Sequence, residues 1–169
     1  CCLGYRLQYE NSIEWLRDAS LARMVLNVTT PDFPLTAYEK DSQYKLYISD
    51  IGLLTALYGF DMKKAIIDNT LKGNVKGGIY ENLILDMLSK RGYRLSYYRT
   101  ENGSVEIEFL ISQSAQIIPI EVKASNSSTV SLNELLEKPD IPFGYKLISG
   151  NIGVNGKKIV LPLYMAMFI

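Results

Sequence analysis

The sequence of 169 residues predicts a mixed α/β (α+β) fold, in which helices flank a sheet. Hydrophobic residues make up 47% of the chain and charged residues 21%, a balance that allows a globular core to form. Helix and strand patterns both occur in the region up to Phe60. From residue 79 on, one amphipathic helix pattern is followed by three strand patterns, which predict a sheet of several strands.

The region up to Phe60 is expected to mix short helices and strands. Asn11 and Glu14 have the spacing of a helix-capping pair, and Asp50 is placed to cap a second helix that Gly59 ends. Two prolines in the segment 29–34 place a loop between the expected strands. The expected elements are a helix over 11–20, strands over 21–28 and 44–48, and a helix over 51–58.

Glycines make the segment 63–78 the expected boundary or mobile loop between two parts of the chain. We expect a small helical, winged-helix-like region over 1–72 and a second domain over 73–169. In the second domain, the Asn-Gly turn at 101–104 predicts a hairpin. The elements expected there are helices over 79–91 and 132–137, strands over 94–99, 105–111, 116–123, 145–149 and 159–163, and a loop rich in Ser and Asn over 125–129.

The composition excludes several classes of function. Lys and Arg total 18, as do Asp and Glu, so the chain lacks the overall positive charge typical of nucleic-acid-binding domains. Without a histidine, it cannot build a Ser-His-Asp triad, a Cys-His pair or an HExxH zinc site. The adjacent Cys1 and Cys2 form no disulfide framework and favour a reducing compartment. Because no apolar run is long enough for a membrane span, we expect a cytoplasmic protein, and the start without Met suggests a piece of a longer chain.

Acidic residues and one lysine gather in two neighbouring strand patterns. Strict alternation over 105–111 places Glu106 and Glu108 on the face opposite the apolar residues. In the next strand, alternation places Glu121 and Lys123 together. If the two strands pair as a hairpin, carboxylates and an ammonium converge on one side of a sheet. This is the outline of a site for a hard cation such as Mg²⁺, which prefers oxygen ligands.

Glu81 belongs to an otherwise apolar stripe of its helix, with Ile84, Leu85 and Leu88. A carboxylate in that position faces either the interior or a site. Simpler interpretations stay open. Glu81 would be favoured in a first helical turn by the helix dipole, the strand acids would suit a solvated edge, and Lys123 would suit an ordinary ion pair with a neighbouring acid.

The same residues resemble the core of the PD-(D/E)XK nuclease-like superfamily. In this resemblance, Glu108 and the run Glu121-Val122-Lys123 match the motif, and Glu81 matches the helix glutamate that completes the usual quartet. The resemblance implies a restriction-endonuclease-like mixed sheet flanked by helices over 73–169. It also implies Mg²⁺ as the cofactor, with Glu108 and Glu121 as its ligands.

A closer resemblance is to the C-terminal domain, itself of unassigned function, of archaeal and bacterial AAA-type ATPases. It implies an N-terminal ATPase module in the same longer chain, which would bind the ATP, because this sequence has no GxxxxGK[ST] loop. That family usually has Asp at the position of Glu108 and commonly Gly at the position of Ser20. The longer carboxylate of Glu108 would move a bound metal by about one methylene. The matching stretches are 13–21, 45–54, 77–82, 97–99, 106–111, 118–123 and 161–166.

Two of the functions that follow use the same fold. In the first, the chain is a Mg²⁺-dependent nuclease-like domain that hydrolyses phosphodiester bonds of DNA or RNA. Glu108 and Glu121 would hold the metal, Lys123 would orient the attacking water or stabilise charge, and Glu81 would complete the outer shell of the metal or take a proton. In the alternative, a non-catalytic sensor or docking domain binds a protein or nucleic-acid partner and regulates the AAA-type ATPase module.

A third interpretation treats the chain as an oligomerisation unit, since its 12 tyrosines suit a protein interface. For the nuclease-like function, a basic rim would be needed to hold nucleic acid. The cations available for that rim are Arg91, Arg94, Arg99, Lys157 and Lys158. No membrane partner is expected.

Overall fold

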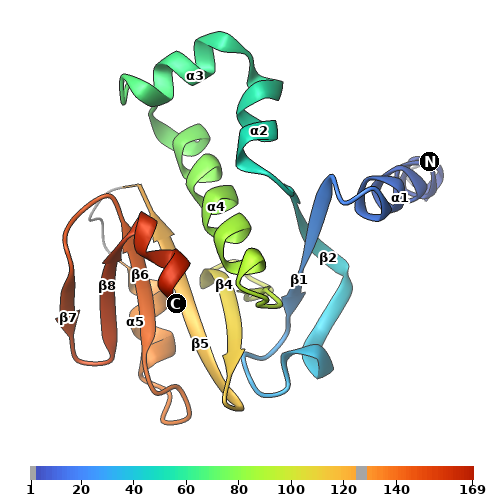
Figure 1. Ribbon diagram of the computed structural model, residues 1–169. Coiled ribbons are helices and arrows are strands. Elements are labelled where there is room, and N and C mark those ends of the chain that lie inside the picture. Colours follow the sequence, from blue (N-terminus) through green and yellow to red (C-terminus); the bar gives the residue numbers. More distant parts are fainter. Residues whose placement is uncertain (1–2, 125–128) are drawn as a thin grey trace.

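A mixed sheet of eight strands forms the centre of the protein in a computed structural model that describes residues 3–124 and 129–169 (Figure 1). Helices lie on both faces of this sheet, so the predicted α+β class is confirmed. The predictions for Cys1 and Cys2, and for residues 125–128 of the Ser/Asn-rich loop, lie outside the described residues.

The strand order is β2-β1-β3-β4-β5-β6-β8-β7. Three neighbouring pairs are parallel, namely β1 with β3, β5 with β6, and β6 with β8, and the remaining pairs are antiparallel. The predicted hairpin pairing of the two acidic strands is therefore confirmed, as β4 with β5. The strands are β1 (Ala22–Val28), β2 (Glu39–Ile48), β3 (Ser96–Arg99), β4 (Glu106–Gln113), β5 (Gln116–Lys123), β6 (Gly144–Ile148), β7 (Gly153–Asn155) and β8 (Lys158–Pro162).

One apolar cluster covers each face of the sheet. Helix α4 (Gly73–Lys90) contributes Ile84, Leu85 and Leu88 to the first cluster, where they pack with residues of β4 and β5. On the opposite face, α5 (Val130–Leu136) buries its leucines in the second cluster. The 3-10 helix Leu163–Phe168 packs beside α4. The two clusters together bury the central strands on both sides, which explains why β4 and β5 are nearly continuous apolar runs.

The remaining helices lie at the periphery. Helix α1 (Leu3–Asp18) extends away from β1, and α2 (Ile51–Tyr58) and α3 (Phe60–Ile67) project beyond the end of the sheet (Figure 1). A short 3-10 helix, Leu35–Tyr38, precedes β2. As predicted, the Asp50 side chain caps α2 by accepting a hydrogen bond from the Leu53 amide at 2.8 Å. Among the described residues, no helix has the length and apolar character of a membrane span.

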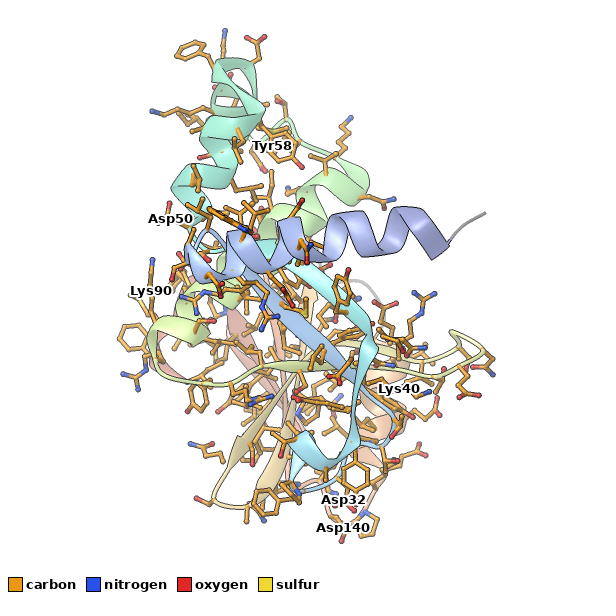
Figure 2. The ribbon with its side chains drawn as sticks, turned by 90° about the vertical axis from the view of Figure 1, so that its right-hand side faces the viewer. Asp32, Lys40, Asp50, Tyr58, Lys90 and Asp140 are labelled. Carbon is orange, nitrogen blue, oxygen red and sulfur yellow. The ribbon has the colours of Figure 1, made fainter. Side chains whose placement is uncertain are left out.

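The base of α2 is tied to the C-terminal end of α4 by charge. Lys90 Nζ lies 2.8 Å from Asp86 Oδ2 and 3.9 Å from Asp50 Oδ2. Asp50 and Lys90 are labelled on the same side of the molecule in Figure 2, with Tyr58 further out near the end of α2.

The structure corrects several expected boundaries. Much of the segment 63–78, expected to be a loop, is helical, because α3 runs to Ile67 and α4 begins at Gly73 rather than Ile79. Strand β7, with three residues, was not predicted. The start of α4 coincides with the expected boundary between 1–72 and 73–169, yet the sheet crosses it, since β1 pairs in parallel with β3. The expected winged-helix-like region therefore contributes β1 and β2 to the common sheet.

Candidate functional site

Strands β4 and β5 separate at one end, and the predicted site lies at this fork. Their last paired residues are Phe109 and Ile120, after which β5 continues only alongside β6. The Val122 amide donates instead to Glu108 Oε2, at 3.3 Å. The carboxylate thus takes the place of a backbone acceptor, because a buried amide needs a partner.

A β-bulge in β4 sets the position of Glu108. Tyr98 pairs with Ile107 and Ser96 pairs with Leu110, so Glu108 and Phe109 together oppose the single residue between Tyr98 and Ser96. Consequently Ile107 packs in the cluster of α5 and Phe109 in the cluster of α4. The prediction of strict alternation along 105–111 is therefore wrong, because the extra residue turns the side chains that follow it to the other face.

Three of the predicted site residues meet at the fork, and we call Glu108, Glu121 and Lys123 the fork cluster. Lys123 Nζ lies 2.9 Å from Glu108 Oε1 and 2.7 Å from Glu121 Oε1. The side chain of Glu121 is 3% exposed, that of Glu108 10% and that of Lys123 30%. The lysine therefore faces solvent more than the two carboxylates that it joins. Glu106 is not part of the cluster, since its carboxylate pairs with Lys45 Nζ at 2.6 Å.

The electrostatics of the fork cluster follow from burial and from the neighbouring charges. Burial raises the pKa of Glu121 to about 7, with the negative charge of Glu108 acting in the same direction and Lys123 opposing both. Burial lowers the pKa of Lys123, but the charges and hydrogen bonds of the two carboxylates outweigh it and raise that pKa above its ordinary value. Near neutral pH, Glu121 is therefore close to its midpoint of protonation while Lys123 is charged.

The donor atoms of the fork cluster fit a hard divalent cation. Glu121 Oε2 is buried and has no hydrogen-bond partner among the described residues, so one oxygen is available as a ligand. The described residues hold no group of three or more His, Cys, Asp or Glu side chains with metal-binding geometry. A two-carboxylate set suits Mg²⁺, which commonly takes one or two protein carboxylates and completes its shell with water and substrate phosphate.

Glu81 lies on the α4 side and does not join the fork cluster by a hydrogen bond or ion pair. Its Oε2 accepts a hydrogen bond from the Tyr47 hydroxyl at 3.0 Å. Burial raises the pKa of Glu81, and the charge of Glu108 adds to this rise, while Lys45 opposes it. Because α4 begins at Gly73, Glu81 is two turns inside the helix, and the interpretation as a first-turn residue favoured by the dipole is wrong.

Tyr47 is the residue that sequence reasoning missed at this position. Burial raises its pKa above the ordinary range, and the Glu81 carboxylate adds to the rise, so the hydroxyl keeps its proton and donates. Asn82, the next residue of α4, also joins this helix to β2. Its side chain exchanges two hydrogen bonds with the Ile48 backbone, at 3.0 and 2.9 Å. The available signal was a tyrosine in a strand pattern, because a buried phenol usually has a polar partner.

The cations proposed for a basic rim are dispersed. Arg94 pairs with Glu39 at 2.6 Å, and Arg99 Nε lies 3.7 Å from Glu106 Oε2. Lys157 donates to the carbonyl oxygens of Lys138 and Ile141. Of this set, Lys158 stands on the face of the sheet that carries Glu121, together with Lys146, which the sequence did not single out.

The fold and the fork cluster define a mixed α+β domain with a buried carboxylate–lysine site. A family model described as "Domain of unknown function (DUF4143)" matches residues 76–165, more than half of the chain, and the chain belongs to this family. A second model, "Domain of unknown function (DUF8612)", matches residues 5–64. No curated protein and no solved structure matches the chain. All four predicted site residues lie in the first matched range, and Tyr47 lies in the second.

Proposed function

We propose that this chain is a PD-(D/E)XK nuclease-like domain that hydrolyses phosphodiester bonds of nucleic acid with the help of Mg²⁺. The observation that carries the proposal is the meeting of Glu108, Glu121 and Lys123 at the fork, where a buried oxygen of Glu121 has no hydrogen-bond partner among the described residues. The order of Glu108 and the run Glu121-Val122-Lys123 along a hairpin also matches the motif of that superfamily.

Each member of the fork cluster has a role in this chemistry. Glu108 and Glu121 would hold the cation, which, when bound, would polarise the scissile phosphate and lower the pKa of a bound water. Lys123 is charged and is the most exposed of the three, so its ammonium would face the substrate and stabilise the negative charge that develops on the phosphate. Glu121, with a pKa of about 7, would lose its proton as the cation binds.

The role of Glu81 stays a prediction. Its carboxylate is directed at Tyr47, and its link to the fork cluster is the electrostatic effect of Glu108 on its pKa. From this position it would act on the site through water, as the outer-shell group or proton acceptor that the resemblance implies.

The partner in this proposal is an N-terminal AAA-type ATPase module of a longer chain, as the resemblance of the ordered motifs suggests. ATP would bind that module alone, because the sequence in hand has no phosphate-binding loop of the Walker type. We also propose a cytoplasmic location, because the adjacent Cys1 and Cys2 form no disulfide framework and favour a reducing compartment.

Calorimetric titration with Mg²⁺ and Mn²⁺ tests the metal site. Binding is expected in the wild type and should disappear in Glu108→Gln and in Glu121→Gln. Glu134→Gln, on the exposed side of α5, removes the same charge away from the fork and should bind as the wild type does. Cation binding that persists in both fork variants would exclude this metal site.

Cleavage of labelled DNA and RNA tests the reaction itself. Activity should require a divalent cation and should be lost in Glu121→Gln and Lys123→Met but not in Glu134→Gln. Glu108→Asp is an informative further variant, because its carboxylate is the one usual in the related ATPase domains. It should keep activity, whereas Glu108→Gln should not.

A second candidate is the non-catalytic sensor or docking domain. One observation favours it: Lys123 already contacts both carboxylates, at 2.9 and 2.7 Å, so the cluster holds its own counter-charge without a metal. In this case cation binding and cleavage would both be missing, and the domain would bind a separately produced ATPase module. Pull-down and calorimetry with that module distinguish the two candidates.

A further inference from the structure

A set of lysines extends from the fork cluster across the sheet face that α5 covers. Strands β5, β6 and β8 are parallel neighbours, and residues paired in register point to the same face. Glu121 is paired with Lys146. Gly144 is paired with Lys158, and a Cβ on this glycine would touch Leu132 and Leu136 of α5. Lys146 and Lys158 therefore both stand on the α5 side, with Lys146 beside Glu121 and Lys158 one strand further along the sheet.

The two lysines are diagonal neighbours on adjacent strands. Lys158 is paired with Gly144, which lies two residues before Lys146 on β6. Diagonal neighbours of this kind are about 7–8 Å apart. This separation allows two ammonium groups to approach one anion from two sides. The positive charge of Lys158 also acts on Lys146: burial lowers the pKa of Lys146 and the charge of Lys158 lowers it further.

Neutral groups hold Lys158 in place. Its Nζ lies 2.8 Å from Asn133 Oδ1 and 3.5 Å from Thr129 Oγ1. Within the described residues, its ammonium takes part in no ion pair. Lys146 is only 5% exposed, an unusual position for a lysine.

Three lysines and two glutamates are neighbours on this face. Lys123 contacts Glu108 and Glu121, Lys146 is paired in register with Glu121, and Lys158 is the diagonal neighbour of Lys146. A cluster of three lysines next to a candidate metal site is suited to an anion.

We propose that Lys146 and Lys158 form a phosphate-binding subsite next to Glu121, which takes a backbone phosphate adjacent to the one at the fork. The nature of the ligand, a nucleic acid, rests on the proposed function. Lysine suits this role because its compact charge binds a phosphate without demanding one orientation of it. The subsite would hold the strand in register while the fork cluster acts on the neighbouring phosphate.

Fluorescence anisotropy of labelled single-stranded DNA and RNA, in EDTA, tests the subsite without any contribution from a metal. Lys146→Met and Lys158→Met each remove one charge while keeping much of the side-chain volume. Each should weaken binding by about tenfold and reduce the slope of log Kd against log salt concentration by about one. Lys63→Met removes the same charge from the exposed surface of α3 and should change the affinity less than about twofold.

Thermal unfolding checks that the variants are folded, and Lys158→Met keeps the test valid if burial makes Lys146→Met unstable. Calorimetry with inorganic phosphate and pyrophosphate separates two sources of the ligand. Binding of these small ions that depends on both lysines, without binding of oligonucleotides, would support the subsite but assign it to a free phosphate compound.

Equal affinity for all probes in the wild type and both lysine variants, or an equal loss in Lys63→Met, would overturn the subsite. The result is independent of the nuclease assay. Lysine-dependent binding in EDTA together with no cation binding would keep the subsite while removing the proposed catalytic function.

Discussion

Glu121 is a buried glutamate and Glu81 a half-buried one, and desolvation is the largest cause of the raised pKa of each. Their partners differ. Glu121 pairs with the ammonium of Lys123 through one oxygen, and its other oxygen has no hydrogen-bond partner in residues 3–124 and 129–169. Glu81 accepts a hydrogen bond from the neutral hydroxyl of Tyr47 and lies on the helix that packs against the opposite face of the sheet.

The difference shows how the partner decides what a buried carboxylate can do. The ammonium of a lysine is a counter-charge that can move when a metal ion or a phosphate binds. A carboxylate oxygen that accepts no hydrogen bond can bind a ligand. A phenol supplies a directional hydrogen bond that joins two elements, here α4 and β2, without balancing charge. We therefore expect substitutions at the fork to change charge-dependent properties, and substitutions at the Tyr47–Glu81 contact to change packing.

The largest effect is expected for Lys123→Met. This change leaves two neighbouring carboxylates without their ammonium, so the free energy of unfolding at about pH 8 should fall by about 3 kcal/mol. Most of the loss should be recovered at about pH 5, because Glu121 then carries a proton and the two negative charges no longer meet. Urea unfolding at both pH values measures this, with the exposed Lys138→Met as control. An equal loss at both pH values would indicate a packing defect in place of an electrostatic one.

The next effect is the pH dependence caused by Glu121 itself. The folded protein binds this proton more tightly than the unfolded chain, because the pKa is about 7 when folded and 4.5 in the ordinary case. The stabilisation is therefore fully present below about pH 4.5 and is lost as the pH rises through about 7. Relative to Glu121→Gln, the wild type should lose about 2 kcal/mol of stability between about pH 5 and pH 8. Parallel stability curves for the two proteins would show that Glu121 titrates normally.

Much of the fold could be predicted because it depends on local patterns. The limits of β5 and α2 follow from apolar periodicity, from the Asp50 cap and from Gly59. The start of α4 could not be found in this way, since Gly73, Gly77 and Gly78 disfavour a helix and tertiary packing overrides that preference. Strand β7 is too short to show a period.

The candidate site was predictable in part for the same reason. Glu108, Glu121 and Lys123 lie on adjacent strands of a hairpin, so their proximity follows from local pairing. The bulge that positions Glu108 leaves no mark on the composition of β4. The contact between Tyr47 and Glu81 joins residues that are 34 positions apart, and the pairing of Glu121 with Lys146 depends on a parallel crossover. Neither is visible in a local pattern.

A smaller effect is expected at the packing contact. Tyr47→Phe removes one hydroxyl and leaves the ring in the core beside Phe109, so the free energy of unfolding should fall by about 1 kcal/mol. The affinity for Mg²⁺ should stay that of the wild type, because the Tyr47 hydroxyl donates to Glu81 and, among the described residues, forms no hydrogen bond with the fork cluster. Urea unfolding and calorimetry on the same samples measure both quantities. A large loss of cation binding with little loss of stability would place Tyr47 in the functional site.

The smallest effect on stability is expected for Glu81→Gln, and it tests the comparison most directly. The amide oxygen still accepts the Tyr47 hydrogen bond, so stability should change by less than about 0.5 kcal/mol near pH 6. Because the pKa of Glu81 is raised, its charged form is disfavoured in the folded protein, and the neutral amide should become slightly favourable at higher pH. An outer-shell role toward a metal at the fork would instead cost about 10–100-fold in Mg²⁺ affinity, whereas a packing role costs none. Calorimetry on Glu81→Gln beside Glu121→Gln therefore decides whether the two glutamates serve one site or two separate purposes.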